Sequence, residues 1–356
     1  MSKKKKIIRN ILIIVAAVFV VFSIASFVIV KINFDDIFGR TTMTPSEYTA
    51  YLRYEDVEDE YERELLSFES GENTLQGYLY GADNDKGLVV VCHGLGGGAE
   101  SYLTETLYFV DSGYQVFAYD NTGCYGSEGD NCIGLVQSVI DLDAALTFIE
   151  GEGRFDDLPV LLYGHSWGAY AVTSIYNYDH DVTASVSVSG FNDPMTMIME
   201  WGENMMGGFI HVERPYIYIY QKMIFGDKLG LTAVEGINST DTPVLIIHGT
   251  EDETIGFTTA GTIAYKDEIT NPNVQYKICD KPKQNDHNHL FTDIEAIEYI
   301  EEQNEIYKKL WEKYDGEILD DVKREFYANV DKDKVNVMDE EFMQDVLNFY
   351  EEAINN

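Results

Sequence analysis

The sequence predicts an α/β fold, in which a mostly parallel sheet carries helices on both faces, preceded by one transmembrane helix. From about residue 87 onward, short apolar runs alternate with segments of helical periodicity, which is the pattern of a sheet built from βαβ units. The apolar runs are continuous rather than alternating, as is typical of strands buried on both faces. Residues 11–30 contain no charged residue at all.

The N-terminal 32 residues have the pattern of a membrane anchor. Residues 11–30 are uncharged and mostly apolar, and 20 residues at about 1.5 Å each span about 30 Å, the thickness of a bilayer core. Because Lys3–Lys6 and Arg9 precede this span, the positive-inside rule predicts a cytoplasmic segment 1–10 and a body outside the cell membrane. The alternative is a signal peptide cleaved at Ala25-Ser26. An uncleaved anchor is preferred, because the apolar region of a signal peptide is usually about 7–15 residues long.

The rest of the chain is strongly acidic. The first 32 residues hold six of the 25 Lys and Arg residues and none of the 62 Asp and Glu residues, so the remainder has a net charge of −43. Such a body repels polyanions. We therefore expect no nucleic-acid partner, and anionic phospholipid is a poor candidate for a substrate.

The expected elements follow one another in a regular order. Polar residues 33–61 form a stalk or lead-in, and two β-like runs separated by GENT predict a hairpin over 64–81. Strands are then expected at 87–94, 114–120, 159–164, 183–191, 243–249 and 274–280, and helices at 104–113, 135–150 and 166–178.

Two regions interrupt this alternation. Residues 192–240 are an insert rich in Met and aromatic residues, which fit either an ordinary core or the adaptable wall of an apolar pocket. Residues 292–356 are acidic and helical in pattern. We divide the body into a domain over 62–305 and an extension over 306–356, which either packs on the sheet or binds a protein partner.

The chain contains four cysteines. Cys124 and Cys132 lie eight residues apart in a Gly-rich loop, and outside the membrane they could form a disulfide. Cys92 and Cys279 lie in strand-like runs and are expected to be small buried hydrophobes. No Cys/His spacing indicates a metal site.

The segment LLYGHSWGAYAV (161–172) contains the strongest functional signal. Gly164-His165-Ser166-Trp167-Gly168 fits the pattern G-x-S-x-G, between an apolar strand and a helix. Small residues at both ends allow a tight turn that lifts the serine hydroxyl above the sheet. The alternative is a Gly-rich packing turn, and the placement between a β run and a helix favours the nucleophile.

A nucleophilic serine needs a base, and the base needs a carboxylate that orients it. Asp252 follows the strand that ends at His248-Gly249 and is the preferred acid, with Asp193 as the alternative. His287 follows the last strand and is the preferred base. Its neighbour His289 is the alternative, and this His pair could instead bind a metal or be solvated.

Two backbone N–H groups are candidates for an oxyanion hole. Trp167 directly follows the serine, and Leu95 lies in HGLGGG (93–98), after an early strand. This Gly-rich loop could also be a flexible turn or a phosphate nest. It lacks the G-K-[ST] of a P-loop, and the acidic body disfavours a phosphate ligand.

These motifs together resemble the α/β-hydrolase superfamily, in particular its serine-aminopeptidase-like and monoacylglycerol-lipase-like branch. The resemblance covers about residues 62–305 and rests on HGLGGG, DNTGCYGSEG (120–129), GHSWG, HGTED (248–252) and DHNH (286–289). Relatives often read D-x-R-G-x-G-x-S in the second of these motifs, and here Thr122 stands where Arg is usual. The family's histidine is often followed by Asn, which favours His287.

The resemblance implies a lid in the insert at about 192–240, an acyl-enzyme mechanism, and neither metal nor organic cofactor. We expect a membrane-anchored serine hydrolase in which Ser166 is the nucleophile, His287 the base and Asp252 the orienting acid. Carboxylic esters of small or acyl-bearing molecules are the preferred substrates. A peptidase or aminopeptidase acting on amide bonds and a catalytically inactive binding module are the alternatives.

Overall fold

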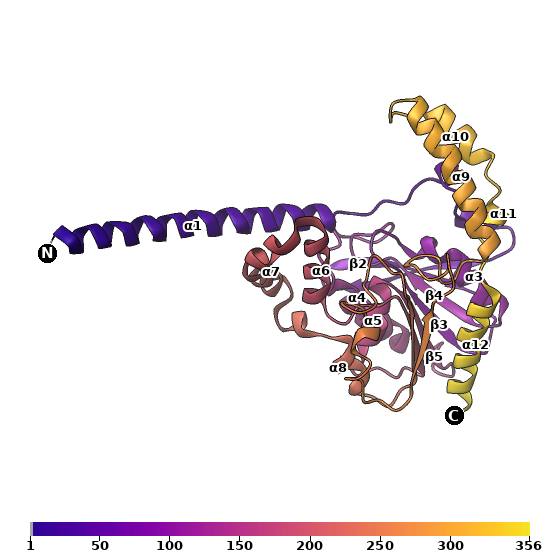
Figure 1. Ribbon diagram of the computed structural model, residues 1–356. Helices are drawn as coiled ribbons and strands as arrows, with labels where there is room; N and C mark the ends of the chain where they lie inside the picture. Colours follow the sequence, from indigo (N-terminus) through magenta and orange to yellow (C-terminus); the bar gives the residue numbers. More distant parts are fainter. Residues whose placement is uncertain (1–2) are drawn as a thin grey trace.

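The centre of the protein is an eight-stranded sheet with the strand order β1-β2-β4-β3-β5-β6-β7-β8 (Figure 1). The computed structural model describes residues 3–356, so residues 1 and 2 of the predicted basic segment lie outside the described residues. β2 is antiparallel to both of its neighbours, and all other neighbouring pairs are parallel. The strands are β1 Arg63–Ser70, β2 Asn73–Tyr80, β3 Leu88–Cys92, β4 Gln115–Tyr119, β5 Val160–His165, β6 Ala184–Val188, β7 Val244–Gly249 and β8 Val274–Cys279.

Helices cover both faces of this sheet, as predicted. Within β3 the side chains alternate between the faces: Val89 and Val91 join one apolar cluster, and Leu88 and Val90 join the other. Both faces are therefore dry, which explains the continuous apolar runs in the sequence. The first cluster includes α3 (Leu103–Asp111) and α12 (Glu340–Asn355), and the second includes α4 (Gln137–Glu152), α5 (Trp167–Ser174) and α8 (Ala233–Asn238).

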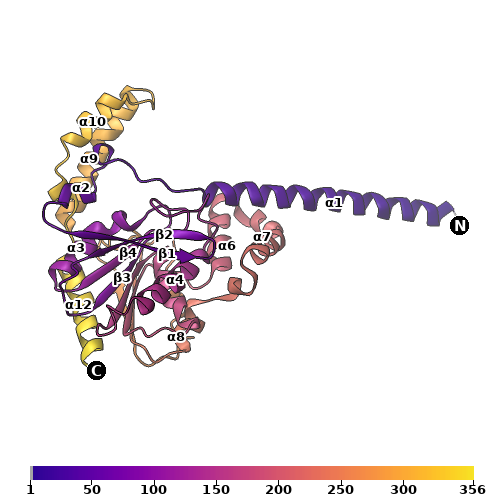
Figure 2. The ribbon, with the colours of Figure 1, turned by 180° about the vertical axis from the view of Figure 1, so that it is seen from behind.

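The C-terminal helix α12 packs on the sheet. Its buried side chains recur at helical spacing, and Tyr350 is fully buried, with its hydroxyl donating to the carbonyl of Leu162 in β5 at 2.8 Å. The proposed boundary at residue 305 falls inside α9 (Ile294–Lys313). The extension is thus divided: α9 and α10 (Asp320–Ala328) project as an arm, joined through α11 (Lys332–Val335) to α12, which completes the core (Figures 1 and 2).

The lead-in to the body is held by specific contacts. α1 (Lys3–Ile37) is one continuous helix, and the segment after it forms bridges at Gly39–Asn131 and Thr41–Cys124. The Arg40 guanidinium donates to the carbonyls of Gly129, Tyr125 and Ser127 at 2.6–2.9 Å. This arginine therefore holds the loop in which Thr122 stands where relatives often have Arg.

The insert between β6 and β7 is helical. It contains α6 (Pro194–Met206), α7 (Ile210–Phe225) and α8, and α7 lies beside α1 (Figures 1 and 2). By length and composition, α1 is the one helix within residues 3–356 that is long and apolar enough to cross a membrane.

The cysteines are all free thiols in this structure. The Cys124 and Cys132 sulfur atoms are buried and lie 3.4 Å apart. Cys92 is buried as expected, and Cys279 is partly buried.

We predict that α12 is required for folding. Tyr350→Ala removes a fully buried ring and the hydroxyl that donates to the Leu162 carbonyl, so the free energy of unfolding should fall by about 3–5 kcal/mol. Chemical denaturation of the full chain in detergent measures this. Glu352→Ala on the exposed side of the same helix is the control and should change stability little. Equal effects of the two substitutions would contradict a core role for α12.

Candidate active site

Ser166 lies on a sharp turn between β5 and α5, with φ 57° and ψ −112°. This conformation is strained for a residue with a side chain. The two glycines of the motif are required by close packing. A Cβ on Gly164 would collide with the backbone of Gly168, and a Cβ on Gly168 would collide with the Cys92 carbonyl in β3. The pattern G-x-S-x-G therefore lets α5 pack directly onto the strands.

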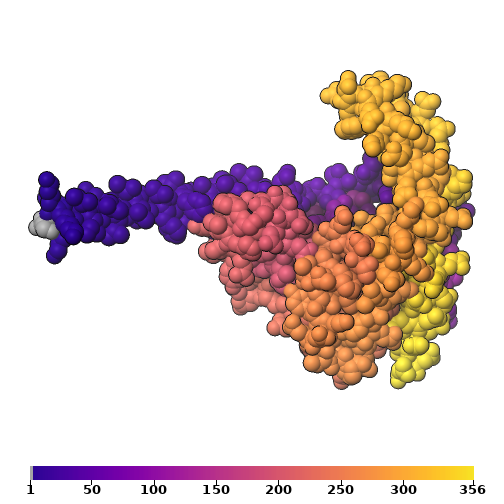
Figure 3. Space-filling model, viewed as in Figure 1, coloured from indigo at the N-terminus to yellow at the C-terminus, as the bar shows by residue number. Residues whose placement is uncertain are grey.

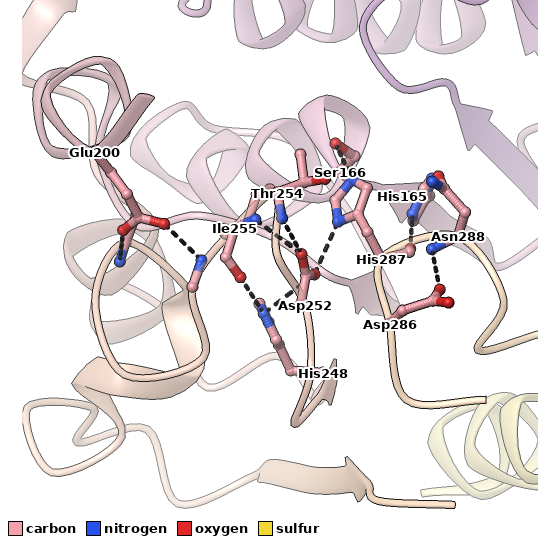
Figure 4. Close-up of polar contacts among 12 residues, drawn as sticks. His165, Ser166, Glu200, His248, Asp252, Thr254, Ile255, Asp286, His287 and Asn288 are labelled. Atoms are coloured by element: carbon pink, nitrogen blue, oxygen red, sulfur yellow. Dashed lines mark hydrogen bonds and ion pairs between the residues drawn. The ribbon is translucent and has the colours of Figure 1, made fainter. Parts of the chain in front are cut away.

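The structure brings Ser166, His287 and Asp252 together (Figure 4). His287 comes from the loop after β8, and its Nε2 lies 2.9 Å from Ser166 Oγ. Its Nδ1 lies 2.8 Å from Asp252 Oδ2, in the loop after β7. With a proton on Nδ1 donated to the carboxylate, the Nε2 lone pair faces the serine hydroxyl and can accept its proton.

The Asp252 carboxylate is held in its ionised form. Burial opposes the charge, but the hydrogen bond and charge of His287 and the Ile255 N–H outweigh it, so the pKa of Asp252 lies below its ordinary value. Its Oδ1 accepts the N–H groups of Thr254 at 2.9 Å and Ile255 at 2.8 Å. These bonds leave Oδ2 directed at His287.

A second chain of hydrogen bonds joins the loops around the serine. The Gly94 N–H donates to the Tyr102 hydroxyl at 3.0 Å, and this hydroxyl lies 2.7 Å from Nδ1 of His165. Nε2 of His165 lies 2.9 Å from the carbonyl of His287. Because the carbonyl can only accept, His165 donates to it, and Tyr102 donates to His165. The Gly-rich loop, the turn at Ser166 and the loop that carries His287 are thus connected through buried groups.

The predicted oxyanion donors are available for a ligand. Neither the Leu95 N–H nor the Trp167 N–H has an acceptor among residues 3–356. The loop that carries Leu95 lies against the serine, since a Cβ on Gly94 would lie 3.5 Å from Ser166 Cβ. Trp167 begins α5, and the N-terminus of a helix favours negative charge.

The two alternative residues have other partners. Asp193 caps α6 by accepting the Thr196 N–H at 2.9 Å. His289 pairs with Asp286 at 2.7 Å. Among residues 3–356, no group of His, Cys, Asp and Glu side chains has an arrangement suited to a metal ion.

The insert is connected to the loop that carries Asp252. Glu200 of α6 accepts the N–H groups of Gly256 at 2.7 Å and Ala260 at 2.9 Å (Figure 4). The Trp201 indole N–H donates to the Thr254 carbonyl at 3.2 Å. Sequence reasoning missed Glu200, Tyr102 and the contacts of His165. Only His165 carried a signal, its place inside G-x-S-x-G.

Part of the chain is similar in sequence to known proteins. Residues 83–225 match the family model described as Serine aminopeptidase, S33. Polyketide transferase af380 of Aspergillus fumigatus is 30% identical over 118 residues, which are 32% of this chain and 40% of that protein. The chain thus matches less than half the length of this curated relative.

Solved structures share the fold. The Pyrococcus furiosus esterase Pf2001 superimposes with a TM-score of 0.54 at 15% identity, covering 78% of this chain and 98% of the other. Another crystal form of that esterase gives a TM-score of 0.51 at 16% identity, with coverage of 76% and 98%.

The strand order and the serine turn define an α/β-hydrolase fold. Over residues 83–225 the chain is similar to the family described as Serine aminopeptidase, S33, and this match supports a hydrolase.

Three buried histidines near the site predict acid-sensitive stability. Burial lowers the pKa of His93 to about 4 and of His165 to about 3, and it also lowers the pKa of His248. In the unfolded chain each would bind a proton near pH 6.5. Their contribution to stability is therefore fully present above about pH 6.5 and is lost as the pH falls toward 4 and then 3.

His165→Gln should accordingly flatten the dependence of the unfolding free energy on pH between 6 and 4, by up to about 1.4 kcal/mol per pH unit. Denaturation of the full chain in detergent at several pH values measures this slope. The control is His211→Gln, since His211 is exposed on α7. An unchanged slope in His165→Gln would contradict a histidine held neutral by burial.

Proposed function

We propose that the protein is a membrane-anchored serine hydrolase that cleaves carboxylic esters of small or acyl-bearing substrates through an acyl-enzyme. The observation that carries this proposal is the unbroken chain of contacts from Ser166 Oγ through His287 to Asp252, at 2.9 and 2.8 Å. A hydroxyl, an imidazole and a buried carboxylate in this order are the components of nucleophilic acyl transfer.

Each group has one role in the proposed reaction. Ser166 Oγ attacks the ester carbonyl while His287 Nε2 takes its proton, and Asp252 stays ionised and orients the imidazolium. The N–H groups of Leu95 and Trp167 donate to the oxyanion of the tetrahedral intermediate. His287 then gives the proton to the leaving alcohol. In the second half of the reaction, His287 removes a proton from a water molecule. The water attacks the acyl-enzyme, and the carboxylic acid and free Ser166 are released.

The insert supports an apolar or acyl-bearing substrate. Met195, Met199 and Trp201 of α6 are only partly buried, as is Leu95 on the Gly-rich loop, and all pack against the core. Such side chains suit an adaptable apolar wall. A second candidate is cleavage of peptide or amide bonds, favoured by the description of the family model that matches residues 83–225.

The proposed location is the cell membrane, with α1 as a single span. The helix is apolar over 11–30, and Lys3–Lys6 and Arg9 lie at its N-terminal end. This asymmetry supports a cytoplasmic N-terminus and a catalytic domain outside the cell.

A fluorophosphonate that traps activated serines tests the triad. The full-length parent should be labelled, and Ser166→Ala should abolish labelling. His287→Ala should lower the labelling rate at least about 10³-fold, and Asp252→Asn about 10³–10⁴-fold, because each is needed to activate the serine.

His289→Ala and Asp193→Asn are the matched controls, and both should keep the parental rate within about tenfold. A folded parent that is not labelled would contradict the proposal and favour an inactive binding module. If His289→Ala abolishes labelling and His287→Ala does not, His289 is the base. The same comparison of Asp193→Asn with Asp252→Asn identifies the acid.

Comparison of an aryl ester with an aminoacyl anilide separates the two candidate reactions. Faster turnover of the ester, lost in Ser166→Ala, supports the esterase. Preference for the anilide would support the peptidase instead, with the same acyl-enzyme chemistry.

A further inference from the structure

Helix α7 of the insert packs against the half of α1 that is nearer the body. The aromatic pairs Phe22–Tyr216, Phe27–Tyr220 and Phe34–Tyr220 have ring centroids 6.1, 6.2 and 5.5 Å apart. The insert forms a lobe along α1 in the space-filling view (Figure 3). Since Phe22 lies eight residues before the end of the apolar span at Val30, α7 reaches about 12 Å into the thickness assigned to the bilayer.

The two polar side chains of the apolar span both face α7. Residues 11–30 contain only two hydroxyl residues, Ser23 and Ser26. Ser23 Oγ lies 3.0 Å from the Tyr216 hydroxyl, and Ser26 Oγ donates to Glu213 at 3.1 Å. A hydroxyl in hydrocarbon is costly without a partner. These contacts explain why the span tolerates the two serines and indicate that α7 accompanies α1 below the membrane surface.

The insert also exposes apolar side chains on the face of α7 that is next to its contact with α1. Val212, Ile219 and Met223 share one face of α7, next to Tyr216 and Tyr220, which contact α1. Met223 is 72% exposed. The apolar stripe of the insert consists of exposed Met205, Met206, Phe209, Val212, Ile219 and Met223.

The stripe contains no charged residue, because the exposed His211 and Arg214 of α7 lie on its other faces. The part of α1 that α7 contacts lies within the apolar span. A group of exposed apolar side chains on one face of a helix marks an interaction site. Because α7 contacts the apolar span at Phe22, Ser23 and Ser26, we infer lipid chains, rather than a separate protein, as the occupant.

We propose that the stripe face of α7 and the turn between α6 and α7 are immersed, together with α1, in the bilayer leaflet on the side of the body. This proposal rests on the membrane anchor of the proposed function but not on its triad. α6 connects the stripe with the site, because Glu200 in the middle of the helix holds the loop after Asp252 while Met205 and Met206 lie at its C-terminal end.

Quenching by brominated lipid tests the immersion directly. Full-length Met223→Trp is placed in phosphatidylcholine nanodiscs with and without dibrominated chains, and the emission of the parent, with its three tryptophans, is subtracted. Val21→Trp, on the exposed side of α1, is the immersed reference, and Glu235→Trp, exposed on α8, is the aqueous reference. We expect the added emission of Met223→Trp to be quenched to the extent of Val21→Trp and that of Glu235→Trp to be unchanged.

Three results would overturn the proposal. Quenching of Val21→Trp without Met223→Trp would mean that α1 spans the membrane and the insert lies in water. A blue-shifted but unquenched Met223→Trp would mean that the stripe is covered by a second copy of the chain. If neither Val21→Trp nor Met223→Trp is quenched, α1 does not lie in the bilayer either. Fluorophosphonate labelling of the same samples reports on the triad independently, so failure of the membrane contact is distinguished from failure of the hydrolase.

Discussion

The site depends on the close crossing of α5 over β5 and β3. A side chain at Gly164 or Gly168 would overlap backbone atoms, so the helix can lie this near only because both positions lack Cβ. The crossing forces Ser166 into a positive-φ turn, a strain of about 1–3 kcal/mol. Burial of all eight residues of α5 offsets it. The same close packing of α5 on the strands holds Ser166 in the turn that presents its hydroxyl above the sheet.

The remaining groups are arranged around this turn by loops that leave the same edge of the sheet. Gly94 follows β3, Ser166 follows β5, Asp252 follows β7 and His287 follows β8. Parallel strands bring their carboxyl ends to one edge. Buried neutral groups then join the loops. His165 contacts Tyr102, which binds the Gly-rich loop, and it donates to the carbonyl of His287 in the loop after β8. His165 thereby joins three loops through neutral groups, and the buried Asp120 accepts the Ala99 N–H at the end of the Gly-rich loop at 2.7 Å.

Both ends of the chain complete this body from outside the central sheet. α12 covers one face with Phe349 and Tyr350, while α1 lies against the insert through Ser23 and Ser26. Arg40, just after α1, holds the loop that follows β4. α1 is therefore joined to the body by packing and hydrogen bonds as well as by the chain.

The strands, the serine turn and the proposed triad could be predicted from local sequence, because periodicity and turn chemistry are properties of neighbouring residues. Ser166, Asp252 and His287 each follow an apolar run, and the geometry brings these three together rather than Asp193 or His289. The partners of Tyr102, Glu200, Tyr350 and Ser26 could not be predicted. Ser26 and Glu213 are 187 residues apart, and Tyr350 and Leu162 are 188 apart. Such contacts are decided only when helices and strands pack, because their side chains give no local sign of which distant surface they will meet.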